Sequence, residues 1–95
     1  MAKYILISTL TERGRATLKK NPERIKEVNK ELKDMGVEVL KQWAVLGPYD
    51  FVNLVEAPDN EAIFKLSTEL GSRGTIEITS MPAITIDELI KTLKP

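Results

Sequence analysis

Tyr49 and Asp50 are the residues of this chain whose types and spacing best suit chemistry, and they follow a Gly47-Pro48 pair. A phenol beside a carboxylate can bind a substrate or take part in proton transfer. The alternative is a turn, in which Asp50 accepts backbone N–H bonds and Tyr49 packs at the edge of a sheet. Because turn chemistry alone explains Gly47, Pro48 and Asp50, the sequence favours the structural interpretation.

Arg13, Gly14 and Arg15 form a second candidate site, in a stretch that separates a predicted strand from a predicted helix. This connection runs over about ten residues, whereas strand-to-helix links usually have about two to six. The glycine would let backbone approach a ligand, and the two guanidinium groups could hold a carboxylate or phosphate near the helix start at Asn21. Any ligand is therefore expected to be small, anionic or carbonyl-bearing, and close to this stretch. The more ordinary interpretation is a short extra helical turn with solvated charges.

Asn53 is a third candidate, because it lies between apolar neighbours in a predicted strand. A buried amide needs partners, so Asn53 could hydrogen-bond across a dimer or to a ligand, and an exposed edge position would explain it equally well. Trp43, the only tryptophan, is more typical of a core or an interface than of a ligand platform. The acidic residues Glu56 and Glu77 have no metal-ligand spacing, so neither a metal nor a cofactor is expected.

The composition excludes several classes of function. The chain has no histidine and no cysteine, which rules out Ser-His and Cys-His triads, zinc-thiolate sites and disulfides. Lys+Arg and Asp+Glu number 14 each, so no net field favours nucleic acid or an anionic membrane. No apolar run approaches the roughly 18 residues of a membrane span, and residues 4–7 are too few for a signal-peptide core. A cytoplasmic protein without nucleic-acid or membrane partners is expected.

Four segments have the patterns of strands. Residues 3–10 are rich in β-branched and aromatic side chains, and residues 37–46 alternate with a period of two. A turn at residues 47–50 leads into a third strand over residues 51–56, so these two strands are expected to pair as an antiparallel hairpin. Residues 75–81 form the fourth strand, which Pro82 is expected to interrupt.

Three helices are predicted between and after these strands. Asn21 and Pro22 supply the N-cap and the first helical residue of one helix, and Asp59 caps another. Thr85 and Glu88, which form a capping box, open a C-terminal helix. The apolar stripes expected to face inward are Ile25, Val28, Leu32 and Met35 in the first helix, Ile63, Leu66 and Leu70 in the second, and Ile86, Leu89, Ile90 and Leu93 in the third.

The order of these elements predicts an α+β, ferredoxin-like βαββαβ fold with a four-stranded antiparallel sheet, plus a C-terminal helix, in a single domain over residues 1–95. In this fold two helices cover one face of the sheet. Residues 4–7 and, apart from Asn53, residues 52–55 are apolar at successive positions, so apolar side chains also project from the uncovered face. A second copy of the chain is the simplest cover, and a homodimer or higher oligomer is expected.

Several short motifs, spread over essentially the whole chain, resemble those of the GYD-domain family. The family is named for a Gly-Tyr-Asp or Gly-x-Tyr-Asp signature, which is seen here as Gly47-Pro48-Tyr49-Asp50. Further matches are Gly14-Arg15, Pro22-Glu23-Arg24, Glu56-Ala57-Pro58-Asp59, and Gly71 with Gly74. The resemblance implies a dimeric α/β barrel, in which ferredoxin-like domains pair sheet to sheet. It implies no catalytic residue, because the family's biochemical role is unassigned.

The leading hypothesis is a non-catalytic, homo-oligomeric domain that binds a small molecule or serves in assembly or sensing. Its candidate ligand-binding residues are Arg13, Gly14, Arg15, Tyr49, Asp50 and Asn53. The alternative is a cofactor-independent enzyme of the dimeric α/β-barrel type, with Tyr49, Asp50 and an arginine around a pocket between sheet and helices. The two hypotheses differ in whether Tyr49, Asp50 and Arg15 converge on one cavity.

Overall fold

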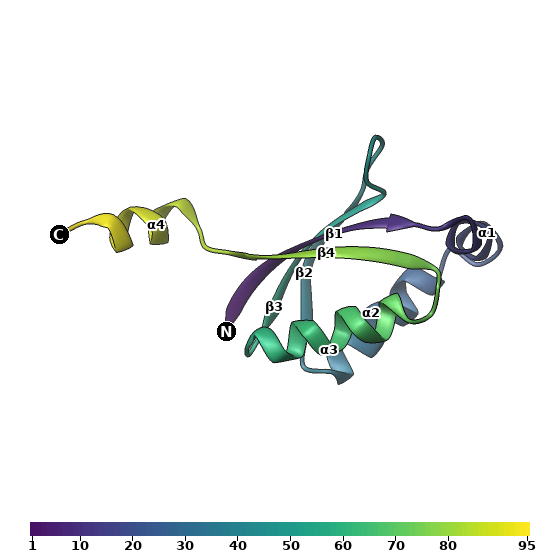
Figure 1. The fold of residues 1–95 in the computed structure, drawn as a ribbon, viewed down its shortest axis with the longest axis horizontal. Helices are drawn as coiled ribbons and strands as arrows, with labels where there is room; N and C mark the ends of the chain where they lie inside the picture. The colour runs from purple at the N-terminus through teal and green to yellow at the C-terminus, as the bar shows by residue number, and fades with distance from the viewer.

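The computed structural model describes all of residues 1–95, and its four strands form one antiparallel sheet in the order β2-β3-β1-β4 (Figure 1). This arrangement confirms the predicted α+β, ferredoxin-like fold. No helix is long and apolar enough to cross a membrane. The elements are β1 (Ala2–Leu10), α1 (Glu12–Lys20), α2 (Arg24–Asp34), β2 (Glu38–Ala44), β3 (Phe51–Ala57), α3 (Asn60–Gly71), β4 (Ile76–Ala83) and α4 (Ile86–Leu93).

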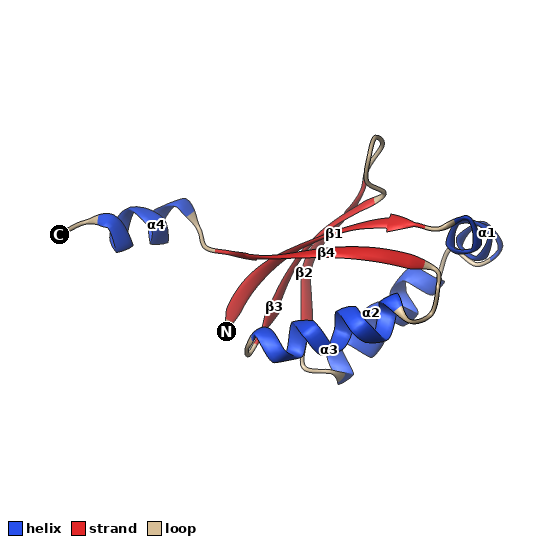
Figure 2. Cartoon of the chain, viewed as in Figure 1, coloured by secondary structure: helices blue, strands red, loops and turns tan.

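The core lies between the sheet and helices α2 and α3, which cover the same face of it (Figure 2). Alternation along β1 buries Tyr4, Leu6 and Ser8 on this face, as the period-two geometry of a strand requires. The hydroxyl of Tyr4 donates to Asn60 Oδ1 at 2.6 Å, so its polar end is satisfied at the start of α3. The apolar core residues are Tyr4, Leu6, Leu32, Val37, Val55, Ala57, Ile63, Leu66 and Leu70.

The stretch that follows β1 is not an extended connection but the helix α1, which is nine residues long. Its N-cap is Thr11, whose Oγ1 accepts the N–H of Gly14 at 3.1 Å. Glu12 lies in the first turn and Lys19 and Lys20 lie in the last, where each charge opposes the helix dipole. The interpretation of this stretch as helical is therefore the correct one.

The predicted start of the next helix is wrong. The N–H of Asn21 donates to Thr17 O at 3.0 Å and ends α1, while α2 begins at Arg24 without a side-chain cap on Glu23. Because α1 occupies the preceding segment, Asn21 and Pro22 form the turn between two consecutive helices instead of opening one.

The fourth strand is not interrupted at Pro82, as the sequence predicts. β4 continues to Ala83, and Pro82 lies opposite Tyr4 of β1. This pairing is possible because β4 is an edge strand, where a residue without an N–H can be placed so that no ladder bond is lost.

The C-terminal helix α4 is formed as predicted, but its apolar stripe does not face inward. The capping box is present, with the N–H of Glu88 donating to Thr85 Oγ1 at 3.1 Å. The Glu88 carboxylate in turn accepts the N–H of Thr85, and this hydrogen bond lowers the pKa of Glu88. α4 lies beyond the end of β4, apart from the rest of the molecule (Figure 1). The stripe residues Ile86, Leu89, Ile90 and Leu93 are therefore 40% to 74% exposed.

Candidate functional site

Asp50 lies where the β2–β3 hairpin meets the end of β1, and its hydrogen bonds are to backbone groups. Its Oδ2 accepts the N–H of Leu10 at 2.7 Å. Its own N–H donates to Ser8 O at 2.9 Å, and its carbonyl accepts the N–H of Val45 at 2.9 Å. These bonds extend the β1–β3 pairing beyond Phe51 and close the hairpin, so the carboxylate has a structural use.

We expect Asp50→Ala to lower the free energy of unfolding by about 1 kcal/mol, the scale of one lost hydrogen bond. Asp50→Asn keeps an acceptor oxygen and should lose less. Urea denaturation followed by circular dichroism measures both effects. An unchanged denaturation midpoint for Asp50→Ala would show that the bond to Leu10 contributes nothing to stability.

Tyr49 and Arg15 do not join Asp50 at a common cavity. Tyr49 is 43% exposed on the hairpin loop. The Nη1 of Arg15 donates to Leu10 O at 2.8 Å, on the same residue whose N–H donates to Asp50. None of the three residues lines any of the five cavities of the molecule. The convergence that an enzyme built on these side chains would need is therefore not present.

At Gly14, α1 lies close against the backbone of the segment before β4. A Cβ added to Gly14 would lie 2.0 Å from Thr75 O. Beside it, the N–H of Thr11 donates to Thr75 O at 3.0 Å, and Thr11 Oγ1 donates to Gly74 O at 2.8 Å. The absence of a side chain at Gly14 thus leaves room for the backbone of Thr75 and not for a ligand. The contact fixes α1 to the end of the sheet.

Arg13 lines a cavity of about 330 Å³, the outer cavity, which lies between α1, α2, the end of α3 and the sheet. Two further arginines, Arg24 and Arg73, are on its wall. Small-molecule sites usually have volumes of roughly 300 to 1,000 Å³, so the outer cavity is large enough for a small ligand. The apolar side chains of its wall are Leu10, Leu18, Ile25, Val28, Phe51, Leu70 and Ile76.

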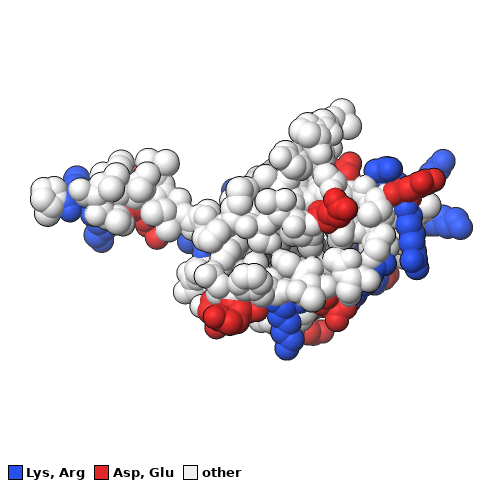
Figure 3. Space-filling view, viewed as in Figure 1, with Lys and Arg blue, Asp and Glu red and all other residues white.

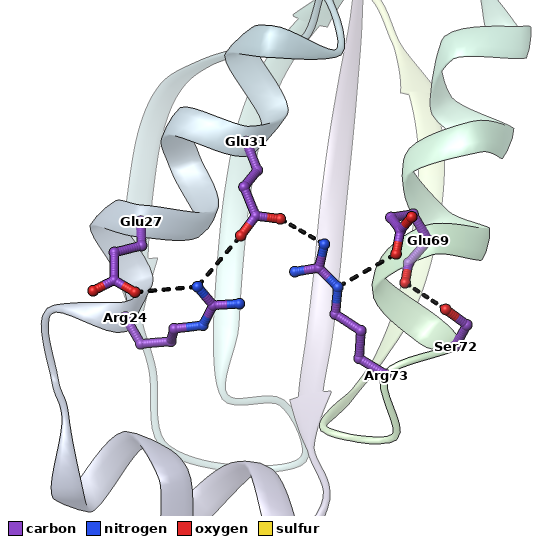
Figure 4. Close-up of polar contacts among 6 residues, drawn as sticks. All are labelled: Arg24, Glu27, Glu31, Glu69, Ser72 and Arg73. Carbon is purple, nitrogen blue, oxygen red and sulfur yellow. Dashed lines mark hydrogen bonds and ion pairs between the residues drawn. The ribbon is translucent and has the colours of Figure 1, made fainter.

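A chain of ion pairs holds two of these arginines and joins α2 to the end of α3 (Figure 4). Glu31 accepts from Arg73 Nη2 at 2.5 Å and from Arg24 Nη1 at 3.3 Å. The hydrogen bond from Arg73 lowers the pKa of Glu31, and the same bond raises the pKa of Arg73. Glu27 extends the chain to Arg24 at 3.1 Å, and Glu69 extends it to Arg73 at 3.4 Å. The network fixes two guanidinium groups beside the outer cavity.

Asn53 lies in a smaller, inner cavity of about 70 Å³ between α2 and the sheet. Its Nδ2 donates to Leu6 O at 3.4 Å, whereas its Oδ1 is buried and has no hydrogen-bond partner. Ser8, which is only 3% exposed, lines the same cavity. The inner and outer cavities adjoin, because they share the wall residues Ile25, Val28, Phe51 and Leu70. Of the candidate ligand residues, the structure therefore brings Arg13, Gly14 and Asn53 together at two adjoining cavities.

Among the other polar residues that line these cavities, Ser8, Arg24 and Arg73 are not predicted from the sequence to be site residues. Ser8 has the appearance of an ordinary polar position in a strand, and Arg24 stands out only within the motif Pro22-Glu23-Arg24. The position of Arg73 between Gly71 and Gly74 indicates a loop but not the surface that it faces. The outer cavity needs α1 as a wall, and the sequence predicted only a short helical turn there, not a helix of nine residues.

The sheet face opposite α2 and α3 carries a continuous apolar patch, as expected. The register places Ile5 opposite Leu54 and Ile7 opposite Val52, and directly opposed residues share one face of the sheet. Figure 3 shows in addition that the tip of the β2–β3 hairpin carries no charged side chain, while charges gather over the helices. We call the apolar patch on the sheet the open face. Its residues are Ile5, Ile7, Trp43, Val52, Leu54 and Met81.

Comparison with known proteins gives one family and one curated relative. The model of the family described as "GYD domain" matches residues 4–93. A protein of Thermus thermophilus named "Glutamine synthetase and cystathionine beta-lyase binding protein" is 53% identical over 95 residues, which cover 99% of this chain and 100% of that protein. No solved structure matches the chain.

Proposed function

Because this chain belongs to the GYD-domain family, as the match over residues 4–93 establishes, we propose that it is a non-catalytic, homo-oligomeric protein that acts by binding other proteins. The observation that carries this proposal is the amount of apolar surface that the fold leaves uncovered, on the open face and on α4. Tyr49, Asp50 and Arg15 do not share a cavity, which gives the alternative of a cofactor-independent enzyme no support.

A second copy of the chain is the proposed cover of the open face. Two sheets that pack face to face lie about 10 Å apart and bury their facing side chains, and Ile5, Ile7, Val52 and Leu54 provide an apolar centre for such a contact. A stable contact buries at least about 1,000 Å² in total. Because α4 directly follows β4, a copy stacked on the sheet would also lie next to the start of α4 and its exposed stripe.

The proposed partners are enzymes of the two kinds named in the Thermus relative, a glutamine synthetase and a cystathionine beta-lyase. The support for this step is the identity of 53% along the full length of both proteins. A binding role also suits a chain without histidine or cysteine, in which the usual catalytic side chains are scarce.

Light scattering coupled to size-exclusion chromatography tests both parts of the proposal. Alone, the chain is expected to elute at a multiple of its 10.7 kDa mass. Mixed with purified glutamine synthetase or cystathionine beta-lyase from the same source organism, it should co-elute with the enzyme, and serum albumin is the control protein. A chain that elutes at 10.7 kDa and shifts with neither enzyme would refute the proposal.

A further inference from the structure

We propose that the adjoining outer and inner cavities bind one small monocarboxylate, which has an apolar body and a hydrogen-bond donor at the end opposite its carboxylate. This inference goes beyond the proposed binding of proteins and does not depend on it. Three observations carry it: two adjoining cavities with shared apolar wall residues, guanidinium groups at the outer cavity, and an unpaired amide oxygen on a residue that lines the inner cavity.

The apolar body follows from the walls where the two cavities meet. Ile25 and Val28 come from α2, Leu70 from α3 and Phe51 from β3, and all four side chains border both cavities. A ligand that occupies both cavities would therefore contact these four side chains along its middle. Aliphatic and aromatic side chains on both sides favour an apolar group there, such as a single ring.

The arginines of the outer cavity indicate that the ligand carries a carboxylate. The guanidinium of Arg13 makes no hydrogen bond or ion pair within the chain, and Arg73 uses only Nε and Nη2, which leaves Nη1 as a free donor. Glu31 and the other carboxylates of the network do not line the cavity, whereas the arginines do. One unpaired guanidinium with one further donor matches the single charge of a carboxylate and its need for hydrogen-bond donors. A doubly charged phosphate would leave one negative charge uncompensated.

The unpaired side-chain oxygen of Asn53 indicates that the other end of the ligand carries a hydrogen-bond donor. Leu6 O is an acceptor, so the amide must point its Nδ2 toward it, and the Oδ1 is then the atom left without a partner. A buried acceptor without a partner destabilises the protein, and a ligand hydroxyl that donates to it removes that penalty. Ser8, buried on the adjacent strand, supplies a second polar contact at this end.

Isothermal titration calorimetry with three matched probes tests the proposal. 4-Hydroxyphenylacetate has all three parts, phenylacetate lacks the hydroxyl, and 4-hydroxyphenethyl alcohol lacks the carboxylate. We expect 4-hydroxyphenylacetate to bind, and each of the other two compounds to bind at least roughly tenfold more weakly. A tenfold loss is the scale of one lost hydrogen bond to a buried or charged group. No heat of binding from any of the three at millimolar concentration would overturn the proposal.

Two variants and a control assign the two ends of the ligand. Arg13→Ala should remove the preference for the carboxylate, and Asn53→Ala should remove the preference for the hydroxyl while phenylacetate binds as before. Asn53→Leu, which fills the same space, serves if the alanine variant does not fold. Arg15→Ala is the matched control, since Arg15 is on α1 near Arg13 but bonds to Leu10 O and lines neither cavity. Equal losses from Arg13→Ala and Arg15→Ala, or a hydroxyl preference that survives both changes at Asn53, would overturn the assignment.

Discussion

Gly14→Ala is expected to lower the free energy of unfolding by about 3 kcal/mol, the upper part of the range for overpacking a filled interior. The added Cβ would lie 2.0 Å from Thr75 O, which is a backbone atom and cannot turn aside as a flexible side chain can. Relief therefore requires α1 to move away from the segment before β4. That movement would break the bonds from Thr11 to Thr75 O and Gly74 O. Urea denaturation followed by circular dichroism measures the loss.

Gly71→Ala is the matched control for this substitution. Gly71 is the last residue of α3, and a Cβ added there meets no atom within 4 Å. Because alanine has the higher helix propensity, this variant should keep its stability or gain up to about 1 kcal/mol. Equal stabilities of the two variants would mean that α1 does not pack on Thr75 as described.

Leu54→Glu is expected to convert the proposed oligomer to a species of 10.7 kDa. Leu54 lies near the centre of the open face, opposite Ile5 on one side and Lys41 on the other. In a sheet-to-sheet contact this carboxylate and Lys41 opposite it would both be desolvated, and the cost of desolvating two charges exceeds what their attraction returns. In a monomer the same carboxylate would stay in water beside Lys41, so the fold itself is expected to persist. Light scattering gives the mass and circular dichroism reports the fold.

Thr68→Glu controls for the added charge. Thr68 is exposed on α3, on the side of the molecule opposite the open face. This variant should keep the mass of the unmodified protein. If Leu54→Glu also kept that mass, the second copy would have to be bound elsewhere, and α4 would be the next surface to alter.

The strands and the two core helices were predictable because each carries a signal within a few neighbouring residues. The stripe Ile63, Leu66, Leu70 specifies both a helix and the side that packs, whereas the period of two in residues 37–46 specifies only the strand. A register shift between Val39 and Lys41 places Val39 against the core but Trp43 on the open face, so the alternation does not carry through β2. The apolar open face was predictable for the same reason, since successive apolar residues in a strand must supply both faces. The inward stripe of α4 was not, because a periodic stripe shows that a helix has an apolar side but not that the same chain covers it.

The candidate cavities were harder to predict, because distant segments create them. Gly14 is conspicuous in the sequence, but its role depends on Thr75, which lies far along the chain. The outer cavity brings Arg13, Arg24 and Arg73 together from three separate segments, and their spacing in the sequence does not indicate that they meet. The hydrogen bond from Asn53 to Leu6 O joins β3 to β1, and only that bond reveals which amide atom of Asn53 is left unpaired.

The position of β1 in the sheet also has a consequence for the order of folding. β1 is the first strand to be synthesised, yet it lies between β3 and β4, and its residue Leu10 pairs with Ile76. Neither edge of β1 can be paired until β3 has been made, and the second edge remains unpaired until β4 follows. Contacts so distant in sequence slow folding, and in the meantime the apolar segment at residues 4–7 is exposed to other nascent chains. Aggregation during synthesis, rather than instability of the finished fold, is thus where this topology is most vulnerable.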